Sequence, residues 1–226
     1  MPSIPLTNTD NTLERVRLAL LTIDALRLPS SLQSHVETVL VRQVAKIMDE
    51  ALPWQQGHGR RTVALAQIIG KAAGLCEDAL HHLRLAALLH DIGLLASPGK
   101  PQSHAGYLDA ESYTALQCHP RAGAQWLEPF RFLGNASVII AHHHERWDGS
   151  GYPYGIRGSF IPAEARVLAI ADAFDSIQVP GVIDQKTRAR VAYRILAVAA
   201  GTQFDPRLVE ICGQCLQRPN LFSLLN

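Results

Sequence analysis

Apolar residues recur at intervals of three and four along almost the whole chain, and the alternating pattern typical of half-buried strands is lacking. Pro, Gly, Ser and Asn residues interrupt this periodicity and set the expected ends of the helices. The pattern predicts nine helices, over residues 12–26, 32–52, 60–73, 77–95, 110–130 (interrupted at Pro120), 136–145, 163–178, 185–200 and 206–217. The sequence therefore predicts an all-α fold.

The first fifty residues carry none of the His-Asp, His-His and Gly-rich motifs that appear later in the chain. We therefore expect residues 1–50 to form an N-terminal helical extension and residues 51–226 to form the functional domain. Such an extension is too short for a separate sensory domain of ordinary size. Its first predicted helix, residues 12–26, is a candidate contact for a homodimer.

Composition narrows the expected partners. The net charge is +1 and no dense Lys/Arg run is present, which disfavours a nucleic-acid polymer or an anionic membrane as partner. No apolar stretch reaches the roughly 18 residues of a membrane span, and residues 1–6 do not resemble a signal peptide. We expect a cytoplasmic protein. The lone CxxC of Cys212 and Cys215 is interpreted as a pair of packing residues rather than a zinc or redox site.

Several polar side chains interrupt strongly apolar helical segments. His90 and Asp91 lie in LLHDIGLL, His143 and His144 follow the apolar residues 138–141, and Asp172 lies in VLAIADAF. Burying an unpaired polar or charged group costs several kcal/mol. Each residue on its own has an ordinary explanation, a hydrogen bond or a salt bridge in the core. A metal centre is the partner that would satisfy imidazoles and carboxylates together.

Two further histidines stand at helix irregularities, His58 after Gly57 and His119 before Pro120. Together with the preceding group they give five His and two Asp on five segments. Seven ligands are too many for one tetrahedral zinc ion and suit two metal ions that share a bridging carboxylate. Iron, manganese and zinc all accept this mixture of ligands.

Six strings, taken together, identify a family resemblance. The strings are GHGRRTVALA at 57–66, LLHDIG at 88–93, HPRAGA at 119–124, HHERWDGSGYP at 143–153, IPAEARVLAIADAFDSI at 161–177 and GTQFDP at 201–206. Through these strings the chain resembles the HD-GYP family, a branch of the HD metal-dependent phosphohydrolases.

The resemblance implies an HD-type helical bundle around a metal centre that hydrolyses cyclic di-GMP. It implies two divalent metal ions, iron being the first expectation and manganese or zinc the alternatives. By motif, the implied metal ligands are His58, His90, Asp91, His119, His143, His144 and Asp172. His90 and Asp91 are the implied catalytic pair, with Asp91 bridging the metals. Gly151, Tyr152 and Pro153 are expected to shape the substrate site and a surface for a GGDEF-type synthase or another signalling partner.

The chain departs from the family pattern at several positions. Trp54 stands where members with a third metal carry Glu, Leu94 replaces the Lys that usually follows HDIG, and Gly59 replaces a Ser. Gly181 and Asp184 fall about where two substrate-binding cations are expected. Lys186 and Arg188 are close in sequence, and we expect them to compensate as substrate-binding residues.

These departures lead to one expected mechanism and two alternatives. A metal-bound hydroxide would attack the phosphorus of a cyclic dinucleotide, and the absence of a third metal and of the Lys predicts linear pGpG as product. The first alternative is a weak or inactive module that binds a nucleotide or a signalling partner through the loop that contains Gly151, Tyr152 and Pro153, called the GYP loop below. The second is hydrolysis of another small phosphoester.

Overall fold

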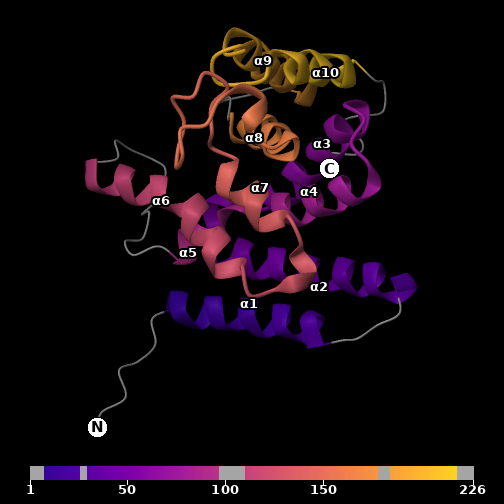
Figure 1. The fold of residues 1–226 in the computed structure, drawn as a ribbon, viewed down its shortest axis with the longest axis vertical. Helices are drawn as coiled ribbons and strands as arrows, with labels where there is room; N and C mark the ends of the chain where they lie inside the picture. The colour runs from indigo at the N-terminus through magenta and orange to yellow at the C-terminus, as the bar shows by residue number, and fades with distance from the viewer. Residues whose placement is uncertain (1–7, 26–29, 97–109, 178–183, 218–226) are drawn as a thin grey trace.

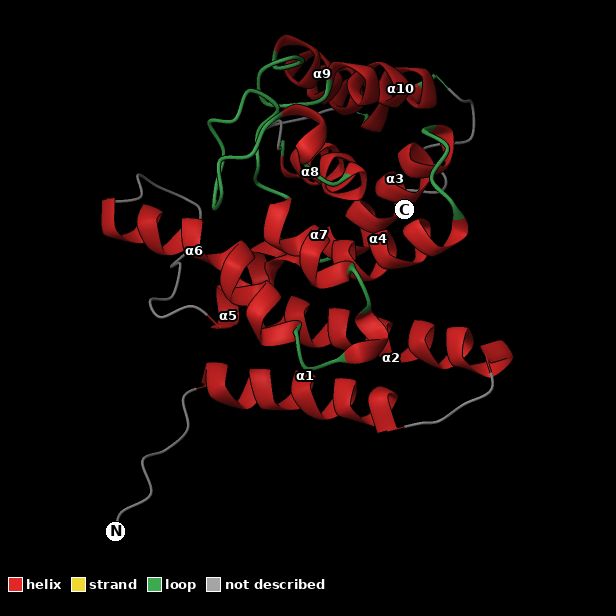
Figure 2. Ribbon diagram, viewed as in Figure 1, coloured by secondary structure: helices red, strands yellow, loops and turns green. Residues whose placement is uncertain are grey.

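The computed structural model describes residues 8–25, 30–96, 110–177 and 184–217, which form helices joined by turns and loops, with no strand among them (Figure 2). The α-helices are α1 Asn8–Ala25, α2 Ser30–Ala51, α3 His58–Ala72, α4 Glu77–Leu89, α5 Gly93–Ala96, α6 Ala110–Leu127, α7 Ala136–His142, α8 Ala163–Ser176, α9 Gln185–Val198 and α10 Pro206–Leu216. Short 3₁₀ turns are η1 Pro53–Gln55, η2 His90–Ile92, η3 Arg131–Leu133 and η4 Gly158–Phe160. The predicted all-α fold is confirmed.

The helices form three tiers in Figure 1: α1 and α2 at one end, α9 and α10 at the other, and α3, α4, α7 and α8 between them. The middle tier is held by fully buried side chains such as Leu65, Leu83, Ile140 and Leu168. Burial of each such side chain stabilises the fold by roughly 1.5–3 kcal/mol. The candidate ligands all lie in this tier or at its edges.

The N-terminal helices pack on each other and on the rest of the molecule. Val16 and Leu20 of α1 and Val44 of α2 are fully buried and belong to the same core as the middle tier. Arg15 and Glu50 form an ion pair of 3.3 Å between the two helices. The division of the chain at residue 50 and the homodimer contact stay predictions.

The predicted helix over residues 77–95 is wrong in one respect, because it breaks at Leu89. The chain continues as the 3₁₀ turn η2 and then as the short helix α5. Gly93, the first residue of α5, lies against α6, and a Cβ atom there would lie 1.9 Å from the carbonyl oxygen of His119. The backbone of α5 therefore approaches α6 more closely than any side chain permits.

The predicted interruption at Pro120 is also wrong, because α6 runs through this residue. Proline removes one helical hydrogen bond, the one that would reach the carbonyl oxygen of Leu116. That oxygen accepts a bond from the Nδ1 atom of His119 instead, at 2.6 Å. A side chain thus replaces the missing backbone donor.

The C-terminal helices begin at aspartates. Asp184 precedes α9 and accepts from the backbone N–H and the hydroxyl of Thr187, and Asp205 precedes α10 and accepts from the N–H groups of residues 207 and 208. Cys212 and Cys215 are buried thiols of α10 that form no disulfide, and burial raises the pKa of Cys212 to about 12. The burial of the two cysteines and the raised pKa of Cys212 agree with the expected packing role.

Among the described helices, none combines the length and the apolar character needed to cross a membrane.

Candidate metal centre

The seven candidate ligands meet in one cluster, although they come from five separate segments. His58 is the first residue of α3, His90 and Asp91 lie in η2, His119 lies in α6, His143 and His144 follow α7, and Asp172 lies in α8. Three overlapping sets of donor atoms have all members within 4.8 Å of one another; they are His58/His90/Asp172, His90/Asp91/His143 and His119/His143/His144. The sequence could name these residues, and the structure places them together.

One half of the cluster lies between α3, η2 and α8. The Nε2 atom of His58 is 3.2 Å from the Nε2 atom of His90 and 3.2 Å from Oδ1 of Asp172. The Nε2 atom of His90 is 3.7 Å from the same Asp172 oxygen. Two imidazole nitrogens and a carboxylate oxygen therefore face one small volume.

The other half lies between α6 and the end of α7. The Nε2 atoms of His119 and His143 are 3.4 Å apart. The ring of His144 lies 5.0 Å from that of His119 and 4.1 Å from that of His143, measured between ring centroids. This half is made of imidazoles alone.

Asp91 lies between the two halves and turns one oxygen toward each. Its Oδ2 atom is 3.1 Å from Nε2 of His90, and its Oδ1 atom is 3.3 Å from Nε2 of His119. A carboxylate so oriented can contact two cations at once. The geometry supports the bridging role that the family resemblance implies for Asp91.

Backbone carbonyl oxygens fix the orientation of three of the imidazoles. The Nδ1 atoms of His90, His119 and His143 donate to the carbonyl oxygen of the residue three positions earlier, at 3.0, 2.6 and 2.6 Å. Such a bond assigns the proton to Nδ1 and leaves the lone pair of Nε2 free for a metal. In all three residues, Nε2 is the atom that faces the cluster.

Sequence reasoning missed the residue that orients His58. Oδ2 of Asp175 lies 2.7 Å from Nδ1 of His58, and both carboxylate oxygens of Asp175 accept from the guanidinium of Arg61, at 2.7 and 2.9 Å. A signal was present, because Asp175 lies three residues after Asp172 and so near the same helix face. Carboxylate–histidine pairs of this kind commonly support metal ligands.

Gln55 is the second residue that sequence reasoning missed. Its Nε2 atom donates to Oδ2 of Asp91 at 2.5 Å, and Gln55 is the residue next to Trp54, which stands at the position of the family's third-metal Glu. Trp54, the residue at that position in the motif, is 41% exposed. The amide of Gln55 therefore provides a neutral contact to the bridging carboxylate.

Two other departures from the family pattern have clear structural consequences. Leu94 is 5% exposed and belongs to the hydrophobic core, so its side chain offers nothing to a phosphate. A Cβ atom at Gly59 would lie 3.5 Å from the carbonyl oxygen of Leu88, which is ordinary contact and leaves room for a small side chain.

The two halves of the cluster differ in their affinity for protons. Burial alone would lower the pKa of His58, but hydrogen bonds to Asp172 and Asp175 outweigh it and raise that pKa to about 10. Burial lowers the pKa of His144 to about 4, and it also lowers the pKa of His143. The His58 half therefore holds protons where no metal is bound, and the imidazole-only half is neutral.

Both cluster carboxylates are ionised. Burial works to raise the pKa of Asp91, and the neighbouring imidazoles, His90 first, outweigh it and hold that pKa well below its usual range. The hydrogen bond to His58 and the charges around it lower the pKa of Asp172 in the same way. Ionised carboxylates and imidazoles with free Nε2 lone pairs make a donor set that fits divalent metal ions.

The GYP loop covers the His144 side of the cluster. The ring of Tyr152 stacks on that of His144 with centroids 5.0 Å apart, and its backbone N–H donates to the carbonyl oxygen of His144 at 3.2 Å. The Tyr152–Pro153 bond is cis. A Cβ atom at Gly151 would lie 2.3 Å from the backbone nitrogen of Arg146, so the loop folds back tightly there.

The remaining expected substrate contacts lie outside this cluster. Lys186 and Arg188 are exposed in the first turn of α9, and within the described residues neither pairs with a ligand residue. Asp184 is the N-cap of that helix, which accounts for an acidic residue at this position. Gly181 lies outside the described residues. The substrate-binding role of Lys186 and Arg188 stays a prediction.

Comparisons with known proteins find relatives of this chain. The chain is 34% identical over 163 residues to the cyclic di-GMP phosphodiesterase response regulator RpfG of Xanthomonas campestris pv. campestris, covering 66% of this chain and 43% of that protein. It is 32% identical over 175 residues to the 3′3′-cGAMP-specific phosphodiesterase 2 of Vibrio cholerae, covering 76% and 33%. The chain thus spans less than half the length of these relatives.

Solved structures show the same fold. The cyclic GMP-AMP-specific phosphodiesterase V-cGAP3 of V. cholerae superposes with a TM-score of 0.61 at 23% identity, covering 75% of this chain and 46% of that one. The model of the HD domain family matches residues 42–208, which include all seven candidate ligands. The chain therefore belongs to the HD domain family, which confirms the family resemblance drawn from its motifs.

Proposed function

We propose that the chain is a metal-dependent phosphodiesterase that hydrolyses a cyclic dinucleotide, with cyclic di-GMP as substrate and linear pGpG as product. The observation that carries the proposal is Asp91, whose two oxygens face two separate groups of imidazoles. Relatives named for cyclic di-GMP and for 3′3′-cGAMP support the substrate class. The choice of cyclic di-GMP rests on the HD-GYP resemblance.

In this mechanism the chain holds two divalent cations, iron being the first expectation and manganese or zinc the alternatives. His58, His90 and Asp172 would hold one cation, His119, His143 and His144 the other, and Asp91 both. The cations would supply positive charge to the phosphoryl oxygens and lower the pKa of water from about 15.7 to about 7.

The protein's own groups prepare this site. Backbone carbonyls and Asp175 hold the protons of four imidazoles on Nδ1, so that Nε2 is the atom offered in each. Gln55 donates a hydrogen bond to the carboxylate of Asp91, and the ring of Tyr152 packs against that of His144. Preorganised donors of this kind avoid the cost of rearranging during the reaction.

The product follows from what the site lacks. Trp54 offers no carboxylate for a third cation, and Leu94 is buried where the family usually has a lysine. We therefore expect the enzyme to open the dinucleotide ring once and to release pGpG rather than to continue to GMP.

The test is anaerobic reconstitution of metal-free protein with Fe²⁺ or Mn²⁺, followed by product analysis with cyclic di-GMP, 3′3′-cGAMP and cyclic di-AMP. We expect turnover of cyclic di-GMP to pGpG and its loss in Asp91→Ala. A fully metallated sample that turns over none of the three would end the enzyme proposal. Nucleotide binding that persists in that sample would favour the binding module instead.

A further inference from the structure

A pocket opens beside the ligand cluster, on the side of α2. Ala45, Met48 and Asp49 of α2 line this pocket together with His58, His90 and Asp91 of the ligand cluster. A surface helix from the N-terminal part of the chain therefore borders the candidate metal centre. No motif of the family resemblance includes this helix.

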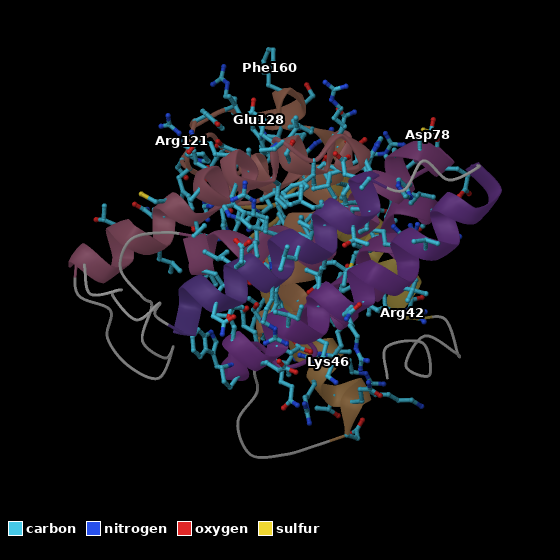
Figure 3. The ribbon with its side chains drawn as sticks, turned by 90° about the horizontal axis from the view of Figure 1, so that it is seen from below. Arg42, Lys46, Asp78, Arg121, Glu128 and Phe160 are labelled. Atoms are coloured by element: carbon cyan, nitrogen blue, oxygen red, sulfur yellow. The ribbon has the colours of Figure 1, made fainter. Side chains whose placement is uncertain are left out.

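Two cations lie on the same face of α2. Arg42 is seven residues and Lys46 three residues before Asp49, and one turn of helix separates Arg42 from the pocket-lining Ala45 and Lys46 from the pocket-lining Asp49. Both side chains are exposed. Figure 3 shows both on one side of the molecule, away from Arg121, Glu128 and Phe160.

Within the described part of the chain, neither Arg42 nor Lys46 forms an ion pair. Of the two acidic residues that follow Lys46 in α2, Glu50 pairs with Arg15 and Asp49 accepts from the N–H of Gly57. At 1.5 Å per residue, Lys46 is about 4.5 Å and Arg42 about 10 Å along the helix axis from Asp49. Their long side chains therefore begin within one helical turn of residues that line the pocket.

A cyclic dinucleotide has two phosphodiester groups, and the reaction engages one of them at a time. The second keeps its negative charge, and Leu94 is buried where the family usually supplies a lysine. We propose that Arg42 and Lys46 of α2 bind the second, non-reacting phosphate of the substrate. The inference rests on the proposed function and names the part of the chain that recognises the substrate's charge.

The expected effect is on substrate binding rather than on chemistry. A contact to the non-reacting phosphate binds the ground state and the transition state equally, so its loss raises KM and leaves kcat unchanged. Partial exposure weakens a charge-assisted bond. We expect KM for cyclic di-GMP to rise about 10-fold in Arg42→Ala and in Lys46→Ala.

The control substrate is bis(p-nitrophenyl) phosphate, a phosphodiester that has no second phosphate. Its turnover should be the same in both variants as in the wild type. Lys71→Ala is the matched protein control, because Lys71 is an exposed cation in the last turn of α3. Lys46→Arg should restore KM. Unchanged KM for cyclic di-GMP in both Ala variants, or equal losses on both substrates, would overturn the inference.

The test also separates this inference from the proposed function. If the metallated wild type hydrolyses neither substrate, the proposed function fails, and calorimetric binding of cyclic di-GMP to the same protein replaces the kinetic assay. A Kd weakened by both Ala variants but not by Lys71→Ala would still support the phosphate contact. A Kd that none of the variants changes, or no binding at all, would reject it.

Discussion

Asp175→Asn tests whether the support around His58 controls metal binding. The wild-type carboxylate receives three donors, Nδ1 of His58 and two nitrogens of Arg61. Asparagine has the same shape, no charge and only one acceptor oxygen. It therefore cannot keep all three bonds, and the imidazole of His58 loses its charged partner.

Two estimates of the loss of metal-binding free energy in Asp175→Asn agree. A hydrogen bond to a charged group contributes about 1.5–3 kcal/mol. Mutation of a residue that supports a metal ligand commonly weakens metal binding about 10–100-fold, which is about 1.4–2.7 kcal/mol. Arg61 is 41% exposed, so water can hydrate the guanidinium once Asp175 no longer pairs with it. We therefore expect the loss of the Arg61 contact to change the stability of the metal-free protein by about 1 kcal/mol or less, and the loss of the buried bond to His58 to cost about 1.5–3 kcal/mol.

The assay is calorimetric titration of metal-free protein with Mn²⁺, together with urea unfolding of the same samples. Arg61→Gln is the control, since it removes the guanidinium and leaves the contact between Asp175 and His58. It should weaken metal binding less than Asp175→Asn does. Wild-type metal affinity in Asp175→Asn would refute the reasoning, and so would a large loss of stability with unchanged affinity.

Three other predictions concern the same cluster. Pro120→Ala restores an N–H that competes with His119 for the carbonyl oxygen of Leu116, so metal affinity should fall several-fold without loss of stability, as shown by titration and urea unfolding. Gly93→Ala places a Cβ atom 1.9 Å from the carbonyl oxygen of His119, so urea unfolding should show a loss of about 1–3 kcal/mol or more. The pKa of His144 is about 4 when folded and 6.5 when unfolded, so the unfolded state binds more protons between these values. Metal-free stability should therefore fall as pH drops from about 6.5 to 4 in a pH series of melts, and His144→Gln should reduce that slope.

Most helices could be predicted from the sequence, because the positions at which a helix begins and ends depend on residues that are close in sequence. The predicted ranges 163–178 and 206–217 match α8 and α10 to within two residues at each end. Apolar periodicity and end signals such as Pro162 and Asp205 are local features. The break after Leu89 adjoins a tertiary contact, the close approach of Gly93 to His119. At Pro120 a local side-chain bond, from His119 Nδ1 to the carbonyl oxygen of Leu116, replaces the missing backbone donor, and apolar periodicity does not reveal such a bond.

The residues around the ligands were harder to predict than the ligands themselves. His58 and Asp175 are 117 residues apart, and Gln55 and Asp91 are 36 apart. A motif identifies a ligand by its own neighbours in sequence, but it does not say which distant polar group will hold it. The motif position also differs by one residue from the residue in contact. The family motif places a side chain of the metal centre at position 54, but Gln55 is the residue that contacts Asp91.

The Nδ1 atom of His58 bonds to a side chain, whereas the Nδ1 atoms of the other three oriented histidines bond to backbone carbonyls. The position of each histidine in its helix explains this difference. His90 and His143 follow the last turns of α4 and α7, and His119 precedes a proline, so each finds a carbonyl oxygen without a helical partner three residues earlier. His58 begins a helix, and that end offers N–H donors instead of acceptors. Its Nδ1 must therefore find an acceptor on another helix, which is Asp175 of α8. A backbone carbonyl cannot be removed by a point substitution, whereas a carboxylate can. Among these four anchors, a single side-chain substitution can therefore remove only the acceptor of His58.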